Sequence, residues 1–379
     1  MMIKVHPDIA GISPYIPGKP IEVLEREYGI TGSIKLASNE NPLGSSRKAL
    51  AAIRHGLKKV RYYPDGAISE LKEALAEKWK VSPDEVMIGN GSNEIIELLV
   101  RTFLFPGDET VMPTPTFSLY ALMVATAHAK SIQVPLKAGR VDLPAMAKAV
   151  TKKTKLVFVC NPNNPTGTIV RRSEVARFLS RIPKRVLVVF DEAYAEYASD
   201  PEFPDSIQFL REGASLVMLR TFSKLYGLAG LRIGYGISRP EVVDYLNRVR
   251  QPFNVNLPAQ QAALAALSDE EHVSASLKVN CDGKAYLCRH FDLMGIKYFP
   301  SESNFICFSL SGSDLKIGSD VYLALLRKGV IIRHLEGMHL RVTVGLPREN
   351  RRFVRTLKDV LLSMSLIAGS TEKGPAATG

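Results

Sequence analysis

One stretch decides the fold of this chain, and it reads Leu216-Val217-Met218-Leu219-Arg220-Thr221-Phe222-Ser223-Lys224. Its first four residues form an apolar run typical of a buried strand, which leads into two hydroxyls and a lysine. Two upstream runs end in the same way, 156–160 before Asn161 and 186–190 before Asp191. Because ligands bind beyond the carboxyl ends of the strands in an open α/β sheet, we expect these polar residues to converge at one edge.

The pattern around this stretch predicts an α/β protein. From about residue 71 to 219, short β-branched runs alternate with helical patterns, which is typical of a mostly parallel sheet wrapped by helices. The expected strands are 85–88, 110–112, 131–134, 156–160, 186–190 and 216–219. Past about residue 256, long helical patterns (259–267, 274–293, 321–328, 349–363) surround short strands at 304–308, 330–333 and 340–344. We therefore expect an N-terminal arm at 1–34 that packs on another subunit or on the small domain, a large domain at 35–255, a small α+β domain at 256–368 and a flexible tail at 369–379.

The composition excludes several classes of protein. The 379 residues are 46% apolar, and no apolar run approaches the ~18–20 residues of a membrane span. The first residues lack the apolar stretch of a signal peptide, so we expect a cytoplasmic protein. The formal charge of +11 is dispersed and no nucleic-acid motif accompanies it, so we interpret it as a solvated basic surface, which also fits anionic small substrates. The four cysteines show no CxxC pair, so neither disulfides nor a metal site are expected, and Cys160 is expected to be buried.

The lysine segment carries the first chemical signal. Lys224 can supply the amine for a Schiff base with an aldehyde cofactor. The hydroxyls of Thr221 and Ser223 and the guanidinium of Arg232 can hold a phosphate. A lone Ser-Lys pair would be an exposed lysine after a strand, whereas the whole segment through Tyr235 favours a cofactor.

A carboxylate supplies the second signal. Asp191 ends a buried apolar run, and a buried carboxylate needs a cation or several donors. A protonated pyridine nitrogen is such a partner, and this pairing would keep the ring an electron sink. Tyr194 and the amide of Asn164, in the loop 161–167, can donate to the ring's phenolate oxygen. Alone, Asp191 would be a helix cap or an ion-pair partner; together with Lys224 it points to pyridoxal 5'-phosphate.

Two further segments are candidates for the same cofactor. The loop with Gly91, Ser92 and Asn93 opens a helix expected at 95–105, so Ser92 is expected as the N-cap and free backbone donors can bind a phosphate. Helix capping alone would also explain this loop. Phe117 is expected to stack on the cofactor ring, with the apolar core as the alternative.

Two arginines near the C-terminus are candidates for substrate binding. Strict alternation in 340–344 places Arg341 on the face opposite its apolar neighbours, where it can grip a carboxylate. Arg333 ends the run 330–332 and can supply a second contact with an anion. Both are otherwise ordinary strand arginines. The nearby His334 and His339 have no carboxylate at a ligand spacing, so no metal is expected.

These motifs together resemble the histidinol-phosphate aminotransferase family, which belongs to the fold-type I pyridoxal-phosphate enzymes. The resemblance runs from about residue 14 to 360. Its segments are 14–20, 35–44, 61–65, 89–94, 161–167, 191–194, 221–235 and 340–345.

The resemblance implies transamination between L-histidinol phosphate with 2-oxoglutarate and imidazole acetol phosphate with L-glutamate. It also implies a homodimer with active sites at the interface, in which Tyr62 reaches the cofactor phosphate of the partner. Arg341 would bind the amino-acid carboxylate, Tyr15 and Arg333 the distal phosphate, and Asn41 would lie close to the substrate. Aromatic-amino-acid aminotransferases and a threonine-phosphate decarboxylase use a similar cofactor site and stay open as alternatives. A regulator on this scaffold would carry an added DNA-binding domain, for which the short N-terminal arm leaves no room.

Overall fold

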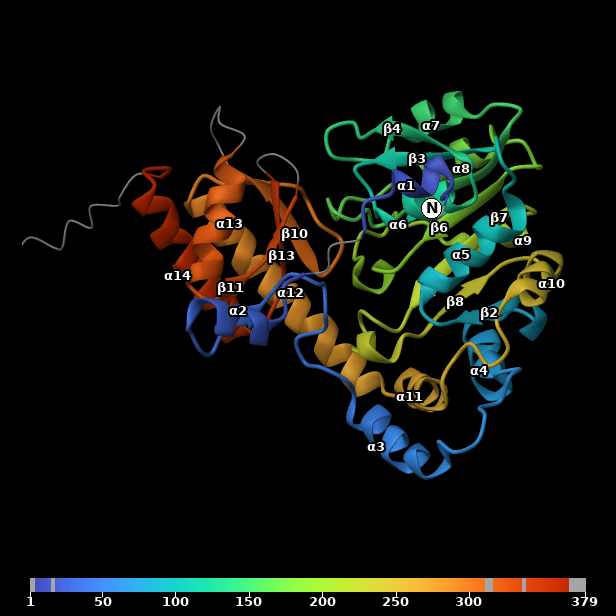
Figure 1. The fold of residues 1–379 in the computed structure, drawn as a ribbon, viewed down its shortest axis with the longest axis horizontal. Coiled ribbons are helices and arrows are strands. Elements are labelled where there is room, and N and C mark those ends of the chain that lie inside the picture. The colour runs from blue at the N-terminus through green and yellow to red at the C-terminus, as the bar shows by residue number, and fades with distance from the viewer. Residues whose placement is uncertain (1–3, 15–17, 311–315, 336–338, 368–379) are drawn as a thin grey trace, which may run out of the picture. The chain divides into compact units, whose positions relative to one another are not determined.

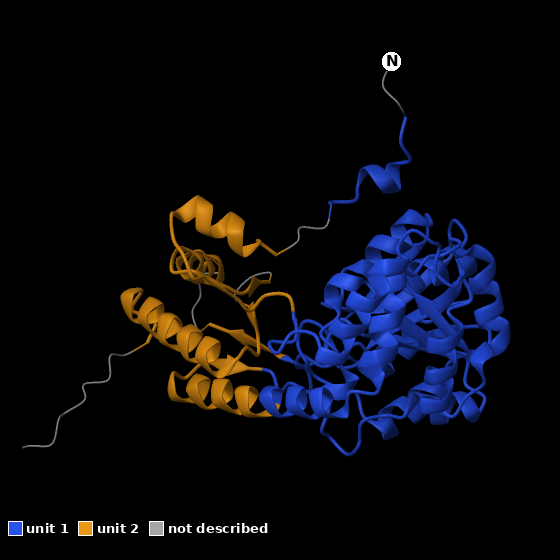
Figure 2. Cartoon of the chain, turned by 90° about the horizontal axis from the view of Figure 1, so that it is seen from below, with its two compact units in different colours: residues 1–16, 39–280, 299–304 blue, residues 17–38, 281–298, 305–379 orange. Residues whose placement is uncertain are grey.

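The structure is a computed structural model that describes residues 4–14, 18–310, 316–335 and 339–367. The chain divides into two compact units (Figure 2). The large unit comprises residues 1–16, 39–280 and 299–304, and the small unit comprises 17–38, 281–298 and 305–379. Tyr15 and the expected tail at 369–379 lie outside the described residues, and the domain boundaries expected from the sequence stay a prediction.

A seven-stranded sheet forms the centre of the large unit (Figure 1). Its strands are β2 (Val86–Gly89), β3 (Glu109–Thr114), β4 (Lys130–Pro135), β5 (Thr154–Cys160), β6 (Leu187–Asp191), β7 (Leu216–Thr221) and β8 (Gly234–Ile237). They lie in the order β2-β8-β7-β6-β5-β3-β4. Strands β3 to β7 pair in parallel, and β8 is antiparallel to both β2 and β7.

The helices of the large unit contact either the sheet or one another. They are α1 (Pro7–Ala10), α3 (Arg47–Gly56), α4 (Ser69–Trp79), α5 (Ser92–Phe103), α6 (Leu119–Thr126), α7 (Leu143–Ala149), α8 (Arg172–Leu179), α9 (Ser206–Arg211), α10 (Pro240–Val249) and α11 (Leu257–Leu267). Helix α5 contacts β2, β7 and β8, whereas α7 contacts β3 and β4. The central strands β5, β6 and β7 are nearly continuous apolar runs, as expected of strands covered by helices.

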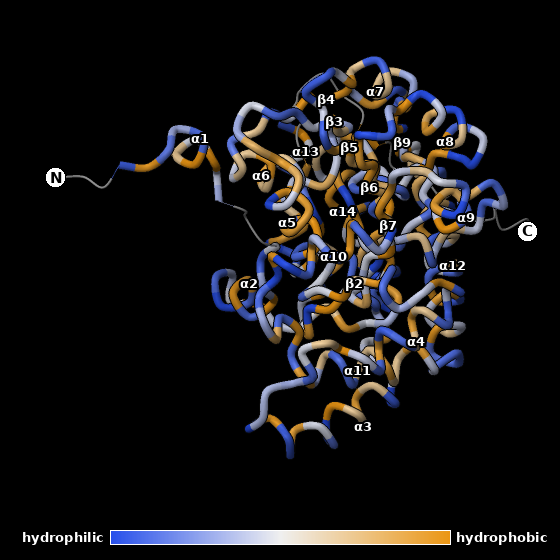
Figure 3. The backbone as a smooth tube through the Cα atoms, turned by 90° about the vertical axis from the view of Figure 1, so that its right-hand side faces the viewer, coloured by the Kyte–Doolittle hydropathy of each residue, from blue (hydrophilic) through white to orange (hydrophobic). Residues whose placement is uncertain are grey.

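Strand alternation sends the chemical residues to one face. On β6, Leu187 and Val189 belong to an apolar core with helices α5, α6 and α10, and Asp191 follows at the same period of two. Cys160 on β5 belongs to this core, and Thr221 follows Leu219 in the same way on β7. In Figure 3 the tube is largely orange along the central strands, whereas the outer helix α3 alternates between orange and blue. The sheet thus delivers these three polar side chains to one edge and one face.

The small unit contains an antiparallel sheet in the order β12-β13-β10-β9. Its strands are β9 (Lys297–Tyr298), β10 (Phe305–Ser309), β12 (Arg333–His334) and β13 (His339–Thr343). A separate parallel pair joins β1 (Ile34–Lys35) to β11 (Val330–Ile331). The helices of this unit are α2 (Ile21–Tyr28), α13 (Ile317–Arg327) and α14 (Pro347–Ser363), and α12 (Glu270–Leu293) has residues in both units.

These elements confirm the expected fold class, and each of the six strands expected in the large sheet is present. The short strand β8 is an additional one. The expected N-cap at Ser92 is wrong, because α5 begins at Ser92 and Gly91 occupies the cap with a φ of 78°. That left-handed backbone favours glycine over serine. Within the described part of the chain, every helix is too short or too polar to cross a membrane.

Candidate active site

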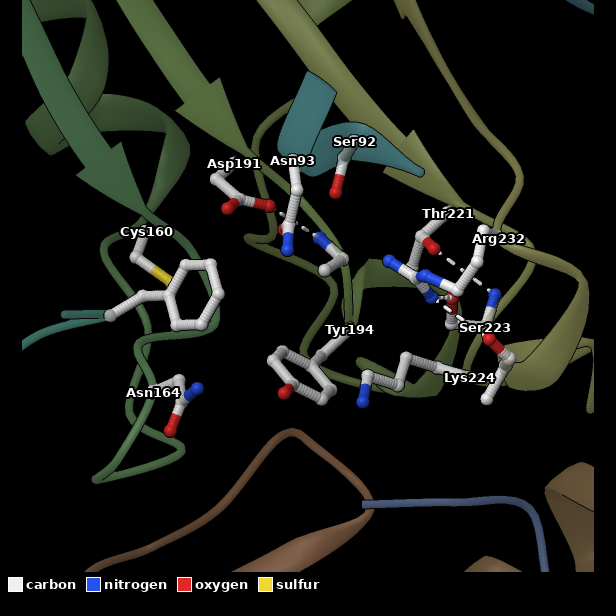
Figure 4. Close-up of a pocket in the computed structure, with 13 residues that line it drawn as sticks. Ser92, Asn93, Cys160, Asn164, Asp191, Tyr194, Thr221, Ser223, Lys224 and Arg232 are labelled. Atoms are coloured by element: carbon white, nitrogen blue, oxygen red, sulfur yellow. Dashed lines mark hydrogen bonds between the residues drawn. The ribbon is translucent and has the colours of Figure 1, made fainter. Parts of the chain in front are cut away.

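A pocket lies at the carboxyl ends of β5, β6 and β7 (Figure 4). It is lined by Ser92, Asn93, Phe117, Cys160, Asn164, Asp191, Ala193, Tyr194, Thr221, Ser223, Lys224, Ala229 and Arg232. The space it encloses, part of it open to solvent, is about 630 Å³. The strand ends therefore converge on one pocket, as expected from the sequence.

Lys224 projects into this pocket beside Tyr194 (Figure 4). Its Nζ atom lies 5.6 Å from the centre of the Tyr194 ring. The Tyr194 hydroxyl accepts a hydrogen bond of 2.9 Å from the amide of Asn39, which is itself buried. The ring is thus fixed in place, and its hydroxyl and the lysine amine face the same space.

Asp191 is 3% exposed and receives two hydrogen bonds. The Tyr120 hydroxyl donates to Oδ2 at 2.6 Å, and the backbone N–H of Ala193 donates to Oδ1 at 3.2 Å. Burial raises the pKa of Asp191, against the opposing effects of these donors and of the Lys224 charge. Burial also raises the pKa of Tyr120 well above its usual range, so the phenol keeps its proton and donates. A cation placed against Asp191 would relieve the burial cost.

Cys160 lines the pocket next to Asp191. It is buried, as expected, and is paired in register with Asp191 across β5 and β6. Burial raises the pKa of its thiol to about 12. The thiol therefore stays protonated, and it donates a weak hydrogen bond from Sγ to the carbonyl of Pro162 at 3.4 Å.

The opposite end of the pocket is rich in donors. Here the N-terminus of α5, with Ser92 and Asn93, meets Thr221, Ser223 and Arg232. The Thr221 hydroxyl accepts from the Ser223 N–H at 3.0 Å, and Arg232 Nη1 donates to the Ser223 hydroxyl at 3.3 Å. Helix N-termini and guanidinium groups both favour phosphate.

Two glycines allow the backbone to approach this end closely. A Cβ at Gly91 would lie 2.6 Å from Arg232 Nη2, and a Cβ at Gly234 would lie 2.4 Å from the backbone nitrogen of Ser92. At Gly234 the neighbouring backbone leaves no room for a side chain, and at Gly91 a side chain would displace the Arg232 guanidinium and strain a backbone with a φ of 78°. The glycines therefore allow the N-terminus of α5 and the guanidinium to lie close together.

The donor set fits pyridoxal 5'-phosphate. Its phosphate suits the end formed by α5, Ser223 and Arg232, and the cationic ring nitrogen suits the buried carboxylate of Asp191. Its aldehyde suits the amine of Lys224, which faces the space between these two ends.

Of the other residues expected at the site, some line the pocket or adjoin it and others lie elsewhere in the large unit. Phe117 and Asn164 line the pocket, and Gly91 caps the helix beside it. Tyr62 lies at the surface with 61% of its area exposed, and Arg61 donates to its hydroxyl at 2.6 Å. Asn41 is buried in the large unit and its amide donates to the carbonyl of Leu225 at 2.6 Å.

The two arginines expected to bind substrate belong to the small unit, on β12 and β13. They are paired in register, Arg333 opposite Arg341. The guanidinium of Arg341 donates to the carbonyl of Ala37 at 2.8 Å and lies 5.0 Å from the Phe305 ring centre.

One group of possible metal ligands occurs in the described residues, formed by His6, Asp8 and His128. These residues lie at α1 and after α6, and none of them lines the pocket. The sequence reasoning also missed two polar residues at the site, Tyr120 and Asn39. Tyr120 lies three residues after the candidate Phe117, and this short spacing is a signal in the sequence that could have identified it as a site residue. Asn39 contacts Tyr194 across 155 residues, so no local pattern identifies it.

Comparisons with known proteins agree with this geometry. The profile of the aminotransferase class I and II family matches residues 31–357, so the chain belongs to that family. The histidinol-phosphate aminotransferase of Moorella thermoacetica is 49% identical over 363 residues, which cover 94% of this chain and 93% of the relative. The enzyme of the same name from Anaeromyxobacter sp. is 48% identical over 95% of this chain and 100% of its own. Within the class, the chain is a member of the histidinol-phosphate aminotransferase family.

A solved structure supports the same assignment. The histidinol-phosphate aminotransferase from Sinorhizobium meliloti, crystallised in complex with pyridoxal-5'-phosphate, matches with a TM-score of 0.89 and 28% identity. The match covers 96% of this chain and 99% of that one. The α/β fold with its small antiparallel domain is therefore that of a pyridoxal-phosphate-dependent aminotransferase.

Proposed function

We propose that this protein interconverts L-histidinol phosphate and 2-oxoglutarate with imidazole acetol phosphate and L-glutamate. The observation that carries the chemistry is one pocket in which Lys224 and the buried Asp191 face a phosphate-binding end. The choice of substrate is supported by relatives of that name at 49% and 48% identity over nearly the whole chain. We also propose a cytoplasmic location, since the substrates are metabolites of amino-acid biosynthesis.

Pyridoxal phosphate, when bound, supplies an electron sink for the negative charge that develops at the substrate's α-carbon. Ser92, Asn93, Thr221, Ser223 and Arg232 would hold its phosphate. Their donors surround one end of the pocket, where the dipole of α5 adds to the charge of the guanidinium.

Asp191 would hold a proton at the ring nitrogen. Its burial makes the ionised form costly, and a positive charge against it lowers that cost. Tyr194 and Asn164 would donate to the ring oxygen, and Phe117 would pack on the ring. The residues that fix the carboxylate and the phenol, Tyr120 and Asn39, keep this arrangement in place before any ligand arrives.

Lys224 would act as general base and acid. Its Nζ would take the proton from the α-carbon of the amino substrate and return it in the reverse direction. The backbone of Lys224 lies in a short turn after β7, where the Gly227 N–H donates to the Lys224 carbonyl at 3.1 Å. The lysine side chain therefore starts from a fixed point beside the pocket.

The substrate's anionic groups call for cations. Arg341 would bind the carboxylate, and Arg333 with Tyr15 would bind the distal phosphate. Arg333 and Arg341 lie opposite each other in register on β12 and β13, and guanidinium groups bind carboxylates and phosphates well, which supports a joint role in binding an anionic substrate. Asn41 would shape the pocket wall near the substrate, held by Leu225 and by the Ser276 hydroxyl at 2.8 Å.

We further propose a homodimer in which Tyr62 reaches the cofactor phosphate of the partner. The support is a cluster of large apolar side chains on the large unit: Leu57, Val60, Tyr62 and Tyr63 are 53%, 58%, 61% and 81% exposed. Such a cluster is typical of an interaction surface. Light scattering of the purified protein tests the dimer, and Tyr62→Phe tests the contact with phosphate.

The visible spectrum tests the reaction. We expect purified protein to absorb visible light through a pyridoxal cofactor bound to Lys224, and to lose this band when glutamate is added. Lys224→Ala should abolish the change. Consumption of glutamate with imidazole acetol phosphate, without release of carbon dioxide from threonine phosphate, distinguishes transamination from decarboxylation. Assays with aromatic keto acids distinguish the related aminotransferases, and a spectrum unchanged by glutamate would reject the proposal.

A further inference from the structure

The turn formed by residues 250–254 connects two loops that are far apart in the sequence. It follows α10 and precedes α11. Its side chains reach the loop 61–66, which carries Tyr62, and the segment 89–94 between β2 and the first turn of α5, which supplies Ser92 and Asn93 to the pocket. These contacts lie within the large unit.

On the pocket side, the turn holds Glu94. The Oε2 atom of Glu94 accepts two hydrogen bonds of 2.6 Å, from the backbone N–H of Asn90 and from the side-chain amide of Asn254. The same amide lies 3.4 Å from the carbonyl of Ile88 at the end of β2. Glu94 is the third residue of α5, so its carboxylate folds back over the loop and fixes the turn into the helix. The position of Ser92 and Asn93 therefore depends on a carboxylate that Asn254 orients.

On the other side, Arg250 holds the turn to the loop 61–66. Its Nη1 donates to Oδ1 of Asn254 at 2.9 Å, and its Nη2 donates to the carbonyl of Gly66 at 2.8 Å. The guanidinium has donors only, so it orients the Asn254 amide with its oxygen toward Arg250 and its nitrogen toward Glu94. Phe253 adds an aromatic contact, since its ring stacks on Tyr63 with centres 4.6 Å apart.

We propose that Arg250 and Asn254 are positioning residues for the cofactor phosphate. They set the orientation of Glu94, and through it the N-terminus of α5, and they tie this end of the pocket to the loop that carries Tyr62. The inference rests on the proposed function, because it assumes that the α5 end binds the phosphate of pyridoxal phosphate. Neither residue lines the pocket, so their effect on the cofactor is indirect.

The test compares two ligands that differ in the phosphate alone. Full-length protein freed of cofactor is titrated with pyridoxal phosphate and with pyridoxal, and binding is followed by visible absorbance. Asn254→Ala and Arg250→Ala should weaken pyridoxal phosphate about tenfold, as expected for the loss of a hydrogen bond to a carboxylate, and should leave pyridoxal unchanged. Arg248→Ala is the matched control, because Arg248 lies two residues away, is exposed and pairs with Asp244 at 2.5 Å.

Exchanging the amide and the carboxylate between Asn254 and Glu94 separates an effect on the position of α5 from an effect on the stability of the whole protein. Asn254→Asp places a carboxylate against Glu94 and should weaken pyridoxal phosphate more than Asn254→Ala does. In Glu94→Gln/Asn254→Asp, the glutamine can accept from Asn90 and donate to the new carboxylate, which also meets Arg250, so binding should recover. Hydrogen exchange gives a second reading: the Asn90 amide should exchange faster in Asn254→Ala than in Arg248→Ala. If the alanine variants do not fold, Arg250→Lys and the double variant carry the same comparison.

The outcomes are distinct. Variants that bind pyridoxal phosphate as Arg248→Ala does, or that lose both ligands equally, would overturn the positioning role while leaving the proposed function intact. Wild-type protein that binds neither ligand would overturn the proposed function and this inference with it.

Discussion

The hydroxyl of Tyr120 offers the sharpest test of the site, through Tyr120→Phe. The substitution removes one oxygen and keeps the ring, which is fully buried, stacks on Phe158 at 4.7 Å and meets Phe117 edge-on at 5.6 Å. The lost oxygen is the donor 2.6 Å from Asp191 Oδ2. After the change, the backbone N–H of Ala193 remains as a donor to this carboxylate, at 3.2 Å.

The size of the effect follows from the charge of the acceptor. A hydrogen bond to a charged group contributes about 1.5–3 kcal/mol, which corresponds to a factor of about 10 to 100. Its loss raises the pKa of Asp191 further above its ordinary value, because burial already raises that pKa and one of the opposing donors is gone. A protonated Asp191 cannot hold the proton on the ring nitrogen. We therefore expect kcat to fall about 10- to 100-fold, with its acid limb moved to higher pH.

The substitution should also change how the free energy of unfolding depends on pH. Because the pKa of Asp191 is raised in the folded chain, its contribution to stability is present below the unfolded pKa and is lost as pH rises through the folded pKa. Removing the Tyr120 donor raises the folded pKa further. In cofactor-free protein, Tyr120→Phe should therefore cost little below about pH 4 and most where Asp191 is ionised.

The assay is the pH dependence of the half-reaction with glutamate, followed by visible absorbance. Tyr235→Phe is the matched control, since it also removes a buried hydroxyl, which accepts from Trp79 Nε1 at 3.0 Å, and it does not line the pocket. A Tyr120→Phe enzyme with the wild-type kcat and pH profile would refute the role given to this hydrogen bond. An equal loss in both variants would assign the effect to general destabilisation.

Three further perturbations have defined outcomes. Gly91→Ala puts a methyl 2.6 Å from a guanidinium nitrogen at a φ of 78°, so pyridoxal phosphate should bind at least about tenfold more weakly by absorbance titration; wild-type affinity would contradict the close approach. Iodoacetamide at pH 8 should alkylate the exposed Cys281 well before Cys160, whose pKa burial raises to about 12, and equal rates in peptide mass spectrometry would contradict this. Arg220→Met leaves the fully buried Glu192 without the guanidinium 2.7 Å away and should lower the free energy of unfolding by about 3–5 kcal/mol, measured by urea titration with tryptophan fluorescence; a loss below about 1 kcal/mol would contradict the burial of this pair.

The strands β5, β6 and β7 could be predicted from the sequence because each is buried on both faces and is an apolar run. The strand β8 could not, since Gly234-Tyr235-Gly236-Ile237 contains two glycines and little apolar bulk. Its glycine at 234 is required by the backbone of α5, 2.4 Å from the missing Cβ, a contact that no local pattern encodes. Close approach between distant segments is invisible in a single sequence.

In the site, too, local patterns could be predicted from the sequence and contacts between distant segments could not. Lys224 and Asp191 could be placed at one edge because Asp191 ends one strand of the sheet and Lys224 follows another. Their supporting partners could not, because Tyr120 meets Asp191 across 71 residues and Asn39 meets Tyr194 across 155. The roles of Arg333, Arg341, Tyr62 and Tyr15 stay predictions from the family resemblance.

The large unit is not one continuous piece of chain, because residues 299–304 return to it after the chain has entered the small unit. This return is hydrogen-bonded in place: the Glu302 N–H donates to the carbonyl of Gly167 at 2.8 Å, and the Glu302 carboxylate accepts from the Ser199 N–H at 2.6 Å. Asn304 donates to the carbonyl of Asn39 at 3.0 Å. A gene truncated after residue 280 would therefore express a fragment that lacks its own last segment, and supplying residues 299–304 as a separate peptide is the natural complementation experiment.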